Sequence, residues 1–136
     1  MSVTPVTPIA PITPVRSARA RRTETPNAVM TTFASPTQGA SQGLSLWQVD
    51  MRAGQRGPEH VFDSEQVWHV LDGTAQIAVD GQPVDLGAGD SLVVPGGAGR
   101  QVTATTAARM VVCGHGHAIV TVPGEAQSRG TPPWIG

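Results

Sequence analysis

A chain of 136 residues with a net charge of −1 is long enough for one domain built around a single core. Its 16 Gly, 12 Pro and few aromatic residues disfavour long helices and favour short strands separated by turns. Residues 23 to 136 carry five Arg and ten acidic residues, which argues against nucleic-acid binding, because phosphate contacts rely on clustered cations. A single cysteine excludes an intrachain disulfide. The sequence shows neither a signal peptide nor an apolar run of membrane-spanning length, so we expect a cytoplasmic protein with no membrane partner.

The N-terminal segment repeats a three-residue unit that ends in Pro, from residue 3 to residue 14. Proline at every third position blocks helices and sheet ladders and favours the polyproline II conformation. Four Arg residues follow within residues 16 to 22. We therefore predict a disordered, Pro-rich tail over residues 1–22 and an ordered domain over residues 23–136. The alternative for the tail is a docking segment for an aromatic groove on a partner.

Short apolar runs separated by turn residues occupy the rest of the chain. We expect strands at residues 29–33, 44–51, 66–71, 75–79, 83–86, 91–94, 101–105, 109–113 and 118–122. Asp72-Gly73 and Asp80-Gly81 predict tight turns in an antiparallel meander. This spacing of strands predicts an all-β sandwich or barrel.

Two stretches of the chain have a recognisable spacing. From Gly54 to Gly73 the pattern is G-x5-H-x-F-x3-Q-x6-G, and from Gly89 to Arg100 it is G-x5-P-x-G-x2-R. They resemble the two motifs of the cupin family, commonly written G-x5-H-x-H-x3,4-E-x6-G and G-x5-P-x-G-x2-H-x3-N. The resemblance covers residues 44–122, the expected core, and is of the kind seen in small bacterial cupins. It implies a single antiparallel, jelly-roll-like β-barrel and a homodimer, in which Trp134 would anchor a C-terminal arm on a neighbouring subunit.

The same resemblance identifies the candidate site. His60 stands at one of the family's metal-ligand positions, whereas Phe62, Gln66 and Arg100 stand where the family usually carries His, Glu and His. Phe62 has no donor atom and Arg100 repels a cation. We therefore predict no cofactor, with a divalent metal at His60 and Gln66 as the alternative.

The residue types in this predicted cavity favour an anionic ligand. Arg100 can bind a carboxylate or phosphate through two hydrogen bonds, and His60 can transfer a proton near neutral pH. Gln66 can form hydrogen bonds, and apolar walls would come from Trp47, Phe62 and Trp68. The predicted function is binding of a small, anionic organic metabolite. The alternatives are a metal-independent isomerase, cyclase or lyase that uses His60 and Arg100, and a metal-dependent oxygenase with an atypical ligand set; whether the protein is an enzyme stays open.

A second group of candidate metal ligands alternates along the chain at Cys113, His115 and His117. On a strand these side chains share one face, although Gly114 and Gly116 fit a loop equally well. A surface role for the group is therefore the alternative. Near the first motif, Glu65 would replace Gln66 in the cavity only if a bulge rotated the strand.

Overall fold

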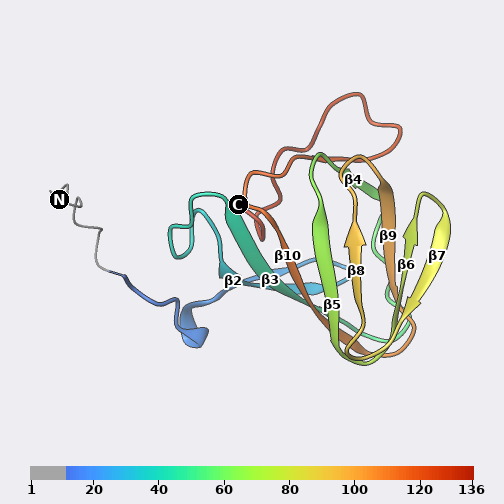
Figure 1. The fold of residues 1–136 in the computed structure, drawn as a ribbon, viewed down its shortest axis with the longest axis horizontal. Coiled ribbons are helices and arrows are strands. Elements are labelled where there is room, and N and C mark those ends of the chain that lie inside the picture. Colours follow the sequence, from blue (N-terminus) through green and yellow to red (C-terminus); the bar gives the residue numbers. More distant parts are fainter. Residues whose placement is uncertain (1–11) are drawn as a thin grey trace, which may run out of the picture.

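The computed structural model describes residues 12–136, and the predicted tail up to residue 11 lies outside these residues. Apart from a short 3₁₀ helix, η1 (Ser17–Arg19), the elements are antiparallel strands in two sheets (Figure 1). The six-stranded sheet has the order β1 (Arg21–Glu24), β2 (Val29–Ala34), β3 (Leu44–Met51), β10 (Ala108–His115), β5 (Gln66–Asp72) and β8 (Ser91–Val94). The five-stranded sheet has the order β11 (Val120–Thr121), β4 (His60–Phe62), β9 (Gly99–Ala104), β6 (Ala75–Val79) and β7 (Gln82–Leu86). The predicted all-β fold is confirmed. None of the residues from 12 onward forms a helix long and apolar enough to cross a membrane.

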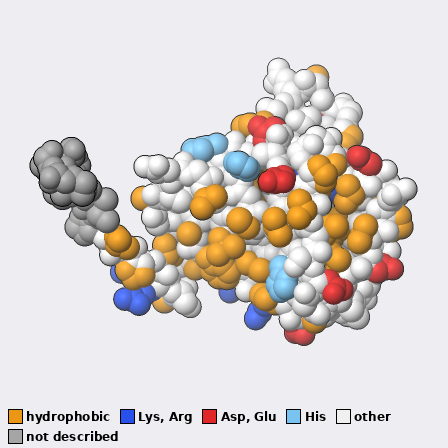
Figure 2. All heavy atoms as spheres, in the orientation of Figure 1, with side chains coloured by type: hydrophobic (Ala, Val, Ile, Leu, Met, Phe, Trp, Pro, Cys, Tyr) orange, Lys and Arg blue, Asp and Glu red, His pale blue; other side chains and the backbone are white. Residues whose placement is uncertain are grey.

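Alternation of side chains along β3 and β10 decides what lies inside the barrel. On β3 the side chains of Trp47, Val49 and Met51 are buried, while Leu44 and Leu46 face outward. Because successive side chains on a strand point to opposite faces, the same sequence builds both the core and the outer surface. Hydrophobic side chains also gather on that outer surface, over β3, β10 and β5 (Figure 2).

The two predicted Asp-Gly turns have different roles. Asp80-Gly81 joins β6 to its neighbour β7, and both residues have positive φ, as a two-residue hairpin requires. Asp72-Gly73 instead carries the chain from β5 in one sheet to β6 in the other. The predicted meander through both turns is therefore wrong, because β5 pairs with β10 and β8 and not with β6.

Side-chain contacts link the first strand of the described chain to the C-terminal end. β1 starts at Arg21, whose guanidinium donates to Thr37 Oγ1 (2.6 Å) and to the carbonyl oxygens of Pro133 (2.8 Å) and Gly136 (3.2 Å). These contacts with residues far along the chain have no local sequence signal. The C-terminal segment is also fastened beside β2, because Ser35 Oγ, one residue after that strand, donates to the carbonyl oxygen of Gly136.

Gly73 is the position where the turn between the sheets tolerates no side chain. Its φ is +77°, and a Cβ there would lie 1.9 Å from the carbonyl oxygen of Ala107. Gly81 has a similar φ of +81° but open space around it, so Gly81→Ala should cost only the conformational strain of about 1–2 kcal/mol. We expect Gly73→Ala to lower the free energy of unfolding by a further ~1–3 kcal/mol, the usual cost of overpacking. Chemical denaturation of both variants measures this difference, and equal losses would contradict the account of the turn.

Candidate functional site

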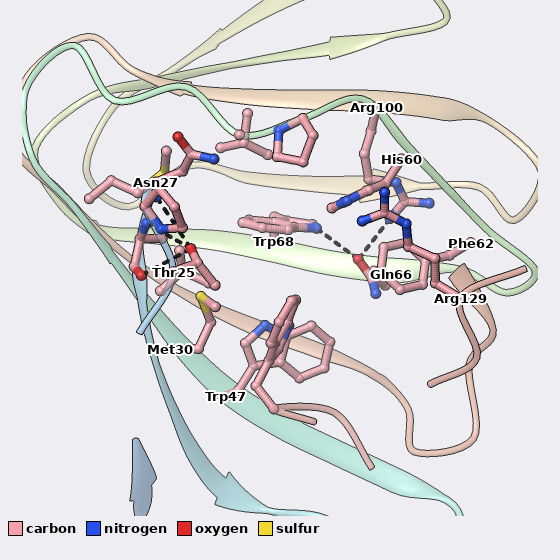
Figure 3. Close-up of a pocket in the computed structure, with 18 residues that line it drawn as sticks. Thr25, Asn27, Met30, Trp47, His60, Phe62, Gln66, Trp68, Arg100 and Arg129 are labelled. Atoms are coloured by element: carbon pink, nitrogen blue, oxygen red, sulfur yellow. Dashed lines mark hydrogen bonds between the residues drawn. The ribbon is translucent and has the colours of Figure 1, made fainter. Parts of the chain in front are cut away.

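A cavity of about 410 Å³ lies between the two sheets, a size that suits a small organic molecule. It is lined by all six residues predicted to bind a ligand or to act on it: Trp47, His60, Phe62, Gln66, Trp68 and Arg100. Figure 3 shows the polar members of this set at one end of the cavity, with Trp68 in the middle and Thr25 and Asn27 at the opposite end.

Strand pairing brings the residues of the polar end together. His60 on β4 is the register partner of Arg100 on β9. Phe62, two residues after His60, lies on the same face of β4, and the Arg100 guanidinium stacks on its ring at 4.8 Å from the centroid. Gln66 and Trp68 are likewise two residues apart and both point inward from β5. The convergence therefore follows from the two-residue period of strands.

The hydrogen bonds of Gln66 determine the electrostatics of this end. Its Oε1 accepts from Arg100 Nη1 (2.7 Å) and from Trp68 Nε1 (3.2 Å). Gln66 Nε2 and Arg100 Nε and Nη2 are buried and have no acceptor among residues 12–136. Arg100 is only 3% exposed, and burial lowers its pKa to about 10. The guanidinium is therefore charged at neutral pH and faces an amide where a carboxylate would neutralise it.

His60 lies beside this charge. Burial lowers the pKa of His60 below its ordinary value, and the positive charges of Arg129 and then Arg100 lower it further. The imidazole is consequently neutral at pH 7 and can accept a proton or a hydrogen bond.

Among the cavity residues that the motifs do not predict, two come from the C-terminal segment. Arg129 lies at the polar end, in the segment after β11, and Trp134 packs against the hydrophobic core of its own barrel. The sequence predicts that Trp134, which follows two prolines, anchors an arm on a neighbouring subunit. Within this chain the arm folds back instead, and Thr32 Oγ1 donates to the carbonyl oxygen of Trp134 (2.7 Å).

These side chains do not fit a divalent metal. Phe62 offers no donor, the Arg100 guanidinium is bonded to the Gln66 oxygen, and only His60 remains as a good ligand. Within the described chain, no three His, Cys, Asp or Glu side chains are grouped so that they could bind a metal ion.

The second set of candidate ligands lies away from the cavity. Cys113 and His115 are exposed on the outer face of β10, and His117 is exposed just beyond that strand. Glu65 is exposed as well, while its neighbour Gln66 is 1% exposed. β5 therefore runs without the bulge that would have brought Glu65 into the cavity.

Comparison with known proteins agrees with the architecture. Residues 47–124 match the family model described as the Cupin domain. The fold is similar to a salicylate 1,2-dioxygenase from Pseudoaminobacter salicylatoxidans, solved with gentisate, at 19% identity and a TM-score of 0.67 over 77% of this chain and 31% of the other. It is also similar to an RmlC-like cupin from Shewanella frigidimarina, at 20% identity and a TM-score of 0.63 over 74% of this chain and 86% of the other. This chain thus spans about a third of the dioxygenase chain. A search among curated proteins finds no match.

The charges around His60 predict how its pKa responds to substitution. The positive charge of Arg129 is one cause of the lowered pKa of His60, so Arg129→Gln should raise that pKa. The pKa should still stay below its ordinary value, because His60 remains buried in this variant. Arg109→Gln is the matched control, since Arg109 is also exposed and ion-paired but does not line the cavity. NMR titration of the imidazole resonances measures the shift. A pKa that is equal in both variants would contradict the placement of Arg129.

Proposed function

Because the chain belongs to the Cupin domain family and its barrel encloses a cavity with a buried cation, we propose that the protein binds a small organic anion there. The anion takes the place of the divalent metal that the family resemblance implies. The single free cysteine, which is exposed, suits a reducing compartment and supports a cytoplasmic location.

The observation that carries this proposal is the set of donors without acceptors at the polar end. Burying a charge is costly unless the charge is paired and hydrogen-bonded. Two guanidinium nitrogens of Arg100 and the amide nitrogen of Gln66 have no acceptor, and no Asp or Glu of the described residues lines the cavity. A carboxylate or phosphate of a ligand would supply both the negative charge and the acceptors.

Gln66 in place of a carboxylate supports the same proposal. A glutamate at this position would form a buried ion pair with Arg100 and cancel its charge. The neutral amide instead orients the guanidinium through one hydrogen bond and leaves the charge available. The remaining walls are apolar and aromatic, which suits a ligand with an aromatic or alicyclic body: Met30, Trp47, Val49, Met51, Trp68 and Val102.

A metal-independent enzyme is the second candidate, and one observation favours it. His60 has a lowered pKa and lies beside Arg100, so a neutral imidazole is available to take a proton from a bound acid whose carboxylate contacts the arginine. An isomerase, cyclase or lyase would use this pair. Turnover that is lost in His60→Gln while the ligand still binds would favour this candidate over a binding protein.

The binding proposal is tested with benzoate and benzamide, which differ in charge but hardly in shape. We expect benzoate to raise the Tm of the protein increasingly with its concentration, and benzamide to raise it much less. In Gln66→Glu the benzoate effect should fall at least about tenfold, because the new carboxylate occupies the Arg100 donors. Thermal unfolding with each compound measures these shifts.

Arg100→Met separates binding from structure. If Arg100 serves the ligand, removal of its uncompensated charge should stabilise the empty protein by about 1 kcal/mol and abolish the benzoate effect. A large loss of stability in Arg100→Met, or equal responses of the wild type to benzoate and benzamide, would overturn the proposal.

We also propose that the protein is a homodimer that pairs through the outer face of the six-stranded sheet. Leu46, Cys113, Val67 and Val93 are register partners in one row across four strands, and all four side chains are exposed. This row contains no charged residue, so a second copy that presents the same row would match it without burying a charge. Figure 2 shows that hydrophobic side chains gather on one face of the molecule.

Light scattering after size exclusion tests the dimer. The wild type should have twice the chain mass of 14.1 kDa, and Val67→Glu should shift it towards the monomer, because a charge at the centre of an apolar interface is costly. Gln82→Glu, on the outer surface of β7, is the control and should remain dimeric. A monomeric wild type, or a dimeric Val67→Glu, would contradict this interface.

A further inference from the structure

The charges of the barrel are distributed unevenly around the cavity. Residues 23 to 136 carry ten acidic residues and five Arg, yet two of these Arg residues, Arg100 and Arg129, line the cavity. None of the acidic residues does, as far as the described residues show. With His60 neutral, the lining carries two positive charges, and one carboxylate would neutralise only half of that charge.

The backbone of Arg129 is fixed beside the polar end. Its N–H donates to the carbonyl oxygen of Val120 (2.9 Å), and Gly130 forms a bridge with the same residue. Val120 belongs to β11, which pairs with β4, the strand that carries His60. Figure 3 shows the side chain of Arg129 at the same end of the cavity as His60, Gln66 and Arg100. The effect of both arginines on the pKa of His60 agrees with this proximity.

The ion pair between Arg129 and Glu125 is weak enough for a ligand anion to replace Glu125. Arg129 Nε donates to Glu125 Oε2 (2.9 Å), and the two side chains are 58% and 39% exposed. An ion pair so exposed contributes only about 0–1 kcal/mol, so an anion in the cavity can compete with Glu125 for the guanidinium.

Access to Arg100 also requires a side chain to move. Its unpaired Nε and Nη2 are fully buried, so an incoming acceptor reaches them only when a neighbour shifts. Arg129 is the exposed charged residue at this end, whereas Gln66 and Phe62 are packed in the interior. Movement of Arg129 from Glu125 towards the ligand would place a second cation beside the bound anion.

Resting on the proposed function, we infer that the ligand is a doubly charged organic anion. One negative charge contacts Arg100 and the second contacts Arg129, which leaves Glu125 as the ligand binds. A dicarboxylate and a phosphomonoester both provide this chemistry, and the cavity volume of about 410 Å³ accommodates either on a single ring.

Isothermal titration with benzoate, phthalate and phenyl phosphate at physiological salt tests the inference. The wild type should bind phthalate or phenyl phosphate about tenfold more tightly than benzoate, which corresponds to one additional charge-assisted contact. Tighter binding of phthalate would identify the ligand as a dicarboxylate, and tighter binding of phenyl phosphate would identify it as a phosphate ester. Arg129→Gln should lower the ratio of dianion to benzoate affinity to about one, and Glu125→Gln should raise the affinity for the dianion by removing the competing carboxylate.

Arg109→Gln is the matched control, because Arg109 forms a similarly exposed ion pair with Asp50 outside the cavity, and it should keep the wild-type preference. The inference is overturned if the wild type prefers neither dianion over benzoate, or if Arg129→Gln keeps the wild-type preference. In either case the proposed function still stands, provided that benzoate binds and that its binding depends on Arg100. If neither benzoate nor the dianions bind, both proposals fail.

Discussion

The buried contact between the Arg100 guanidinium and the Gln66 amide is the constraint on which the rest of the site depends. The 2.7 Å hydrogen bond orients the guanidinium over Phe62 and uses the only side-chain oxygen of Gln66. The same oxygen accepts from Trp68, and the amide nitrogen has no acceptor among the described residues. Two consequences follow: a positive charge without a counter-charge, and a set of buried donors that a ligand can satisfy.

The departures from the family pattern become consistent when they are considered together. A divalent cation needs carboxylate and imidazole donors, whereas a guanidinium supplies positive charge by itself and needs no such donors. Once Arg100 occupies the site, a carboxylate at position 66 would neutralise it, and the amide avoids this. Phe62 then provides a ring on which the guanidinium stacks. The substitutions thus keep a positive charge in the cavity, which comes from the guanidinium of Arg100 and not from a metal ion.

Much of this could be predicted from sequence because it depends on local periodicity. The strand at residues 44–51 and the inward positions of Phe62, Gln66 and Trp68 follow from alternation, and the motif spacing identified the barrel. Long-range contacts could not be predicted. The role of Asp72-Gly73 as a link between sheets depends on which strands pair, and the placement of Arg129 and Trp134 depends on how a segment without motifs folds back over the barrel. Likewise β1 is stabilised by contacts of Arg21 with the last residues of the chain.

The most direct test of the central claim is a crystal structure of the protein purified without chelators, with anomalous data that identify metals. The account predicts density for an organic anion whose oxygens lie about 2.7–3.2 Å from Arg100 Nε and Nη2, the range of protein hydrogen bonds. An anomalous peak for a transition metal bound to His60, or an Arg100 guanidinium turned out of the cavity into solvent, would contradict it.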